Sequence, residues 1–144
     1  MKYRVGKPGR VVVARLEDKD DIIDAVVQIA KKENIRGGLL YLVGGIRQGR
    51  IVVGPEQETM PPVPVWKEID ESHEVVGVGT IFWQDDEPKI HFHGAFGKKE
   101  MVKVGCLRGN SETFLVLEVI ILEIEGIDAK REFDPVSGLT LLKL

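Results

Sequence analysis

The chain has 144 residues, of which 43% are hydrophobic, 30% are charged and 6% are aromatic. This length and this balance indicate one folded globular domain over residues 1–144 and exclude a disordered or fibrous chain. The 20 Lys and Arg residues against 23 Asp and Glu residues give a formal net charge of −3, which argues against the domain-wide positive surface of a nucleic-acid-binding protein.

The sequence shows no signal for a membrane or for secretion. Its longest apolar runs are far shorter than the roughly 20 residues that span a bilayer, and the opening residues MKYRVGKPGR lack the apolar core of a secretory signal. The single cysteine, Cys106, has no partner for an intramolecular disulfide. We therefore expect a cytoplasmic protein with no membrane partner.

The first part of the chain predicts one strand and one principal helix. Residues 10–16, RVVVARL, are apolar and β-branched, which is typical of a strand. The acidic cluster EDKDD follows, and from Asp21 the apolar residues recur at helical spacing as far as Lys31 and Lys32. A strand should therefore lead directly into a helix near Asp20.

After this helix the pattern changes to short β-rich runs that are separated by glycine-bearing or polar turns. The expected strands cover 39–46, 50–54, 73–83, 89–96, 100–107 and 113–124. We expect RQG to close a hairpin between the first two, the proline-rich residues 54–66 to form a loop, and DAKREFDPVSGLTLLK to form two short terminal strands. One early helix and many consecutive strands predict an α+β domain built on a mostly antiparallel sheet.

Two of the three histidines lie two positions apart in the expected strand KIHFHGAF. Side chains at positions i and i+2 of a strand point to the same face, so His91 and His93 project together. If the polar turn FGKKEM is centred on Lys98 and Lys99, His91 lies opposite Cys106, and His93 lies opposite Val104. Two imidazoles and one thiolate suit Zn²⁺ and leave a fourth position for water or a ligand.

A purely structural interpretation of these residues stays open at this point. Histidines in strands are commonly solvent-facing or hydrogen-bonded, and a lone cysteine commonly packs as a small hydrophobic residue. His73 could supply a fourth ligand, although its acidic surroundings at the start of a strand favour a solvated or hydrogen-bonded histidine. Glu68 and Glu74 could accept hydrogen bonds from ligating imidazoles.

The order of these features resembles the plant- and prokaryote-conserved (PPC) domain family in its stand-alone prokaryotic form. The segments that carry the resemblance are GRVVVARLEDKDDIIDAVVQIAKKENIRGGLLYLVGGI, EVVGVGTI, PKIHFHGAF, VGCL with LEVIILEI, and REFDPVSGLTLLKL. The family pattern, His-x-His followed by a Gly-His-Leu element, implies a metal site onto which His91 and His93 map. The third position holds Cys106 in this chain, and cysteine is one of the few residues that can replace histidine as a zinc ligand. The resemblance also implies a single helix packed on an antiparallel sheet and assembly as a homotrimer.

These observations lead to the hypothesis of a cytoplasmic, homotrimeric domain that binds Zn²⁺ through His91, His93 and Cys106, with a small ligand at the open metal position. They assign no catalytic residue. One alternative is a DNA-associated or regulatory assembly module, as in the plant AT-hook proteins, but this acidic chain has no such hook and we expect no nucleic-acid partner. The other alternative is a metal-dependent hydrolase, in which a glutamate such as Glu74 acts as the base on a zinc-bound water.

Overall fold

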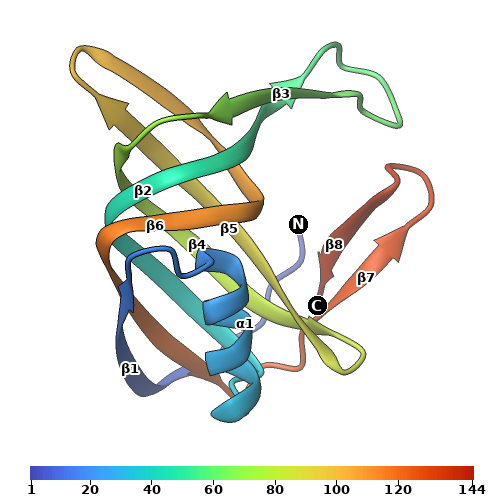
Figure 1. The fold of residues 1–144 in the computed structure, drawn as a ribbon. Helices are drawn as coiled ribbons and strands as arrows, with labels where there is room; N and C mark the ends of the chain where they lie inside the picture. Colours follow the sequence, from blue (N-terminus) through green and yellow to red (C-terminus); the bar gives the residue numbers. More distant parts are fainter.

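The computed structural model describes residues 1–144 and contains one helix and eight strands (Figure 1). In chain order they are β1 Lys7–Glu17, α1 Ile22–Lys32, β2 Gly37–Pro55, β3 Pro64–Ile69, β4 His73–Gln84, β5 Glu87–Lys98, β6 Met101–Glu125, β7 Lys130–Asp134 and β8 Leu139–Lys143. The expected α+β class with one helix near the N-terminus is confirmed. None of the chain's helical segments has the length and apolarity needed to cross a membrane.

Two long strands, β2 and β6, connect the sheet into a ring. Six strands pair in the order β1-β6-β5-β4-β2-β3, and β2 also pairs with β6. The strands β2, β4, β5 and β6 therefore form a closed sheet, in which each strand pairs with two of the other three. The strand β1 pairs with the free edge of β6, and β3 pairs with the free edge of β2. Every pairing in this sheet is antiparallel, as the sequence predicts. The β7–β8 hairpin forms a separate small sheet that contacts β4 (Figure 1).

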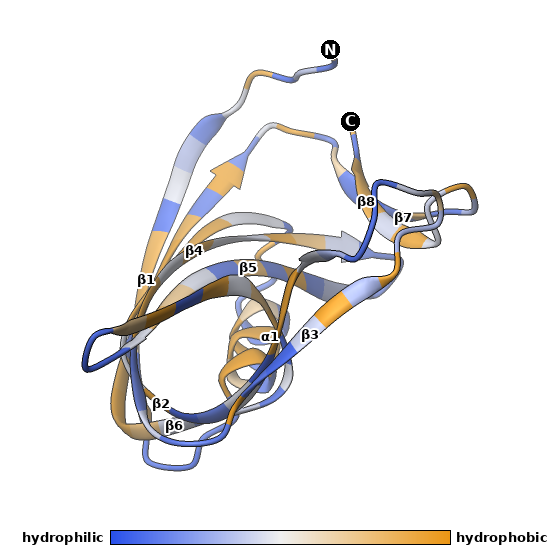
Figure 2. Cartoon of the chain, turned by 90° about the horizontal axis from the view of Figure 1, so that it is seen from above, coloured by the Kyte–Doolittle hydropathy of each residue, from blue (hydrophilic) through white to orange (hydrophobic).

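The helix α1 begins where the acidic cluster predicts it. The Asp21 side chain caps the helix by accepting a hydrogen bond from the Asp24 backbone N–H at 2.9 Å. Its second carboxylate oxygen accepts from the Ser111 backbone N–H at 3.0 Å, which fixes the start of the helix against β6. The buried side chains Ile22, Val26 and Ala30 recur every four residues, so one stripe of α1 lies on β5 and β6 (Figure 2).

Three of the expected boundaries are wrong, and all three concern segments of β2, β3 and β6. Residues 47–49, RQG, do not form a hairpin turn, because β2 continues through them with irregular pairing to β6. The two expected strands 100–107 and 113–124 are likewise one strand, β6. Part of the expected loop, from Pro64 onward, forms β3, which pairs with β2 alone; an edge strand of this kind tolerates proline because it needs fewer backbone donors.

Glycine allows β2 to bend against β6. Gly44 has a φ of +145°, and a Cβ atom there would lie 2.5 Å from the Val116 carbonyl oxygen. At Gly45 a Cβ atom would lie 2.4 Å from the carbonyl oxygen of Phe114. The two backbones therefore approach more closely at this point than any residue with a side chain would allow.

An ion pair joins β1 to β6 and predicts a measurable pH dependence of stability. Glu123 is 9% exposed, and its carboxylate accepts hydrogen bonds from Arg10 Nε at 2.7 Å and Arg10 Nη2 at 3.0 Å. These bonds lower the pKa of Glu123. A carboxyl group with a lowered pKa in the folded state stabilises the protein at pH values above the pKa of the unfolded state, about 4.3. This stabilisation is lost as the pH falls through the lower pKa of the folded state.

We expect Glu123→Gln to be less stable than the wild type at neutral pH, with the difference shrinking as the pH falls below about 4.3. Urea unfolding at a series of pH values, at one fixed protein concentration, measures this difference. Profiles that stay parallel across the acidic range would show that the charge of Glu123 contributes nothing to stability.

Candidate metal centre

The strands β5 and β6 bring together His91, His93 and Cys106. His91 and His93 are exposed on one face of β5, while Phe92 between them points to the opposite face and is 0% exposed. Cys106 lies directly opposite His93 on β6 and is 5% exposed. Alternation along β5 and cross-strand pairing to β6 thus position all three side chains on the same face of the sheet.

The predicted register of this hairpin is wrong, but the three side chains still lie on one face of the sheet. Lys98 pairs with Met101, so the turn is centred on Lys99 and Glu100, with Lys99 in the left-handed region at a φ of 53°. His93, rather than His91, therefore faces Cys106, and Val104 faces Ala95. Each partner differs from the predicted one by two positions, and a shift of two keeps every side chain on its face.

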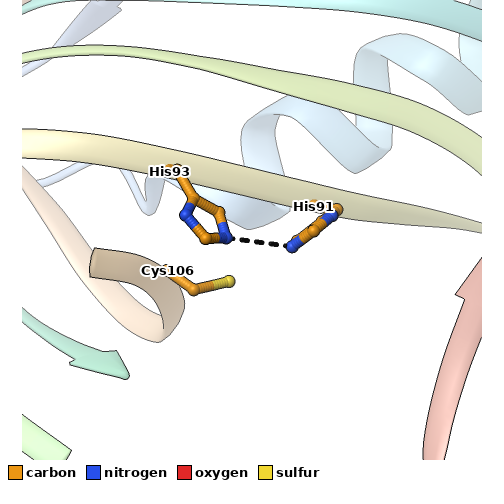
Figure 3. Close-up of side chains that lie close together, drawn as sticks. All are labelled: His91, His93 and Cys106. Atoms are coloured by element: carbon orange, nitrogen blue, oxygen red, sulfur yellow. Dashed lines mark hydrogen bonds between the residues drawn. The ribbon is translucent and has the colours of Figure 1, made fainter. Parts of the chain in front are cut away.

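The ligand atoms of the three residues point toward one another (Figure 3). The Nε2 atoms of His91 and His93 are 3.0 Å apart, and the two rings are nearly perpendicular at 84°. The nearest ligand atoms of all three residues lie within 4.8 Å of one another. Neighbouring ligands around tetrahedral zinc are separated by about 3.3 to 3.8 Å, given bonds of about 2.0 to 2.3 Å. Small side-chain rotations would bring the donor set to this geometry.

The surroundings influence the protonation of these groups in opposite directions. Burial lowers the pKa of His91, and the positive charges of Arg131, His93 and Arg108 lower it further. The neutral imidazole, which is the form that binds metals, is therefore favoured. Burial raises the pKa of the Cys106 thiol, so a metal ion bound here would have to displace its proton.

The other candidate residues of the sequence lie elsewhere. His73 is 4% exposed, its Nδ1 is 2.7 Å from the Glu71 carbonyl oxygen, and it lies seven residues before Thr80, the strand partner of His91. Seven residues of strand correspond to about 23 Å, which excludes His73 as a fourth ligand. Its interpretation as a hydrogen-bonded histidine is confirmed.

Neither glutamate supports the histidines. Glu74 pairs with Gly97, four residues beyond His93 along β5, and Glu68 on β3 forms an ion pair with Arg50 at 3.1 Å. The cluster of metal-binding groups contains no carboxylate. A hydrolase with Glu74 as the base therefore does not fit this arrangement.

Sequence reasoning missed two residues beside the cluster, Thr80 and Arg131. Thr80 on β4 pairs with His91, and Arg131 on β7 donates a hydrogen bond from Nη2 to Thr80 Oγ1 at 2.9 Å. The threonine could have been found by pairing β4 with β5 across the QDDEP turn. No local signal links Arg131, forty residues further along the chain than His91, to this face of the sheet.

Comparison with known proteins identifies the family to which this fold and cluster belong. The Plants and Prokaryotes Conserved (PCC) domain matches residues 3–125, so the chain belongs to this family, as the sequence resemblance indicates. A search of curated proteins found no match.

Solved structures show the same fold. The metal-containing protein AF0104 from Archaeoglobus fulgidus is 25% identical, with a TM-score of 0.87 over 100% of both chains. A plant- and prokaryote-conserved protein from Pyrococcus horikoshii is 22% identical, with a TM-score of 0.85 over 100% of this chain and 98% of that one. A candidate DNA-binding protein from Ralstonia eutropha JMP134 is 19% identical, with a TM-score of 0.75 over 92% of this chain and 90% of that one. The full-length matches include the β7–β8 hairpin, which lies beyond the family match.

Proposed function

We propose that this chain is a self-associating domain that binds one Zn²⁺ ion through His91, His93 and Cys106 and accepts a small ligand at the open position of the metal. The observation that carries the proposal is the convergence of two imidazole nitrogens and one sulfur within 4.8 Å. The description of the A. fulgidus protein as metal-containing, at 25% identity over the full length of both chains, supports it.

The donor set favours zinc over the hard cations. Nitrogen and sulfur ligands suit Zn²⁺, whereas Mg²⁺ and Ca²⁺ prefer the oxygen ligands that this cluster lacks. When bound, zinc would supply a Lewis-acidic position on the exposed face of the sheet. Because no carboxylate belongs to the cluster, the arrangement favours ligand binding over hydrolysis.

Metal analysis of the protein after purification and zinc reconstitution tests this function. We expect one zinc ion per chain that survives dialysis against buffer. Protein that retains no zinc after reconstitution would overturn the proposal.

The exposed face of the sheet supports assembly from several copies of the chain. One row of paired residues crosses five strands, from Val13 through Ile120, Tyr41 and Val78 to His93. The four apolar members of this row are between 39% and 73% exposed. Neighbouring rows on the same face add Val11, Val43, Val76 and Val104, which are 50% to 61% exposed.

We refer to these eight apolar side chains as the outer apolar face. A contiguous exposed surface of this kind is typical of a protein–protein interface. We propose that further copies of the same chain cover it, in the homotrimer that the family resemblance implies. Because the row ends at His93, such an assembly would place the metal centre at the border of the interface.

A single charge on the outer apolar face should dissociate the assembly. We expect the wild type to sediment at three times the chain mass of 16.1 kDa and Val76→Glu to sediment as a monomer, because the variant would bury an unpaired carboxylate. The matched control is Val136→Glu, which adds the same charge at a comparably exposed valine, 69% against 61%, in the β7–β8 turn. This control should remain a trimer, and a monomeric wild type at micromolar concentration would contradict the proposal.

We expect no appreciable DNA binding at physiological salt. The net charge is −3, and the two lysine pairs of the sequence each have one member in an ion pair, Lys31 with Glu87 and Lys98 with Glu71. Neither lysine pair therefore offers two unpaired positive charges to the phosphates of DNA. A mobility-shift assay with duplex DNA at about 150 mM salt checks this expectation, and submicromolar affinity would overturn it.

A further inference from the structure

Arg131 is a buried residue whose guanidinium group has no acidic partner. Its residue is 8% exposed, and it takes part in none of the ion pairs of the structure. The one hydrogen bond of its side chain goes from Nη2 to the neutral hydroxyl of Thr80. The other N–H groups of the guanidinium have no acceptor in the chain, so they are available to a ligand.

The guanidinium group lies beside the candidate metal centre. Its charge contributes to the lowered pKa of His91, and it also interacts with the sulfur of Cys106. Arg108 on β6 acts on the same two groups with a second positive charge. The geometry places Arg131 on this side of the sheet, because its hydrogen-bond partner Thr80 is paired directly with His91.

A surface hollow lies over the same residues. It has a volume of about 340 Å³ and is lined by Leu39, Val78, Gly79, Thr80, His91 and His93. The hollow is therefore bordered by two candidate zinc ligands and by the threonine that holds Arg131. Its remaining walls are Leu39, Val78 and Gly79, and because Val78 also belongs to the outer apolar face, the hollow lies at the border of the proposed interface between copies.

We propose that Arg131 recognises the oxyanion group, carboxylate or phosphate, of a small molecule that occupies this hollow next to the metal. This proposal rests on the zinc-binding function and names the ligand class for its open position. A guanidinium group offers up to five N–H donors in a planar fork that matches an oxyanion, and Thr80 occupies only one of the Arg131 nitrogens.

The charge of the loaded site also favours an anion. A zinc ion with two neutral imidazoles and one thiolate carries one net positive charge, and Arg131 and Arg108 add to it. An oxyanion would supply the counter-charge that Arg131 lacks. The positive field is concentrated at the hollow even though the whole chain is acidic, with a net charge of −3.

Calorimetric titration of the zinc-loaded protein with inorganic phosphate and with acetate, in chloride buffer at constant ionic strength, tests the proposal. We expect at least one of the two anions to bind, and the one that binds more tightly identifies the oxyanion class. Arg131→Gln should retain zinc and weaken anion binding about tenfold or more, because a charge-assisted hydrogen bond is lost.

The matched control is Lys130→Gln, which removes one positive charge from the adjacent residue of β7. The lysine is exposed and paired with Glu132 at 3.2 Å, so this variant should change anion affinity by less than about twofold at physiological salt. Anion affinity in Arg131→Gln equal to that of the wild type, or no anion binding tighter than about 10 mM by the wild type, would overturn the proposal.

Two further measurements separate the possible failures. Zinc content, measured on every sample, shows whether the metal function itself fails, and the anion titration of zinc-free protein then decides the role of Arg131 independently of the metal. If Arg131→Gln does not fold, the side-chain Nε–H resonance of Arg131 in the wild type serves instead. This resonance should shift when phosphate or acetate is added, and an unchanged resonance would overturn the proposal.

Discussion

Replacement of Cys106 by serine is expected to lower zinc affinity by about 100-fold or more. Loss of a residue that only hydrogen-bonds to a metal ligand typically costs about 10- to 100-fold in affinity, and loss of a ligand itself should cost at least as much. The physical reason is that a neutral hydroxyl group replaces a thiolate, the only anionic ligand of the cluster. Replacement by histidine should largely preserve zinc binding, because it restores a nitrogen ligand at the same position. Competition with a chromophoric zinc chelator measures the affinity of all three proteins.

Val104→Ser is the matched control for this series. Val104 lies two residues before Cys106 on the same face of β6 and is 61% exposed, so the variant adds a hydroxyl group beside the cluster without removing a ligand. It should bind zinc as the wild type does, and its oligomeric state is measured in parallel because Val104 also belongs to the outer apolar face. Equal affinity in the wild type and in Cys106→Ser would contradict zinc ligation by Cys106.

Truncation of Phe92 is expected to cause the largest loss of stability, about 3 to 5 kcal/mol for Phe92→Ala. Phe92 is 0% exposed and belongs to the core that α1 and the sheet share. Its ring fills the space that two glycines leave open: a Cβ atom would lie 2.4 Å from the ring at Gly77 and 3.0 Å from it at Gly94. Removal of the ring therefore leaves a cavity that these glycines cannot fill. Urea unfolding at a fixed protein concentration measures the loss.

His93→Ala, one position along the same strand, is the control for Phe92→Ala. His93 is exposed, so in zinc-free protein its truncation should change the free energy of unfolding by less than about 0.5 kcal/mol. A loss below about 1 kcal/mol for Phe92→Ala would contradict the assignment of Phe92 to the core. Together the two variants separate the inner face of β5, which stabilises the fold, from its outer face, which carries the candidate ligands.

The local elements of the fold could be predicted, because they depend on neighbouring residues. The helix start at Asp21 follows from capping and periodicity, and the β5 and β7–β8 strands follow from apolar runs between turn residues. The continuity of β2 through RQG could not be predicted in the same way. That segment resembles a turn in isolation, but its backbone is paired to β6, more than fifty residues away.

The candidate site could be predicted in part for a similar reason. The common face of His91 and His93 depends only on the alternation of one strand, and the nearness of Cys106 survives a register error of two positions because the alternation has a period of two. Thr80 could have been found from the β4–β5 hairpin, whereas Arg131 joins the site through contacts between β4 and β7, which no sequence spacing reveals. Closure of the ring and placement of the C-terminal hairpin, both long-range events, decide these contacts.

X-ray absorption spectroscopy at the zinc edge of the reconstituted protein tests the proposed metal centre most directly, because it reports the number and type of atoms bound to the metal. We predict a four-coordinate zinc with one sulfur neighbour at about 2.3 Å and two imidazole nitrogens at about 2.0 to 2.1 Å. The fourth neighbour should be a light atom from water or a small ligand. A shell without sulfur, or with fewer than two imidazoles, would contradict zinc binding by His91, His93 and Cys106.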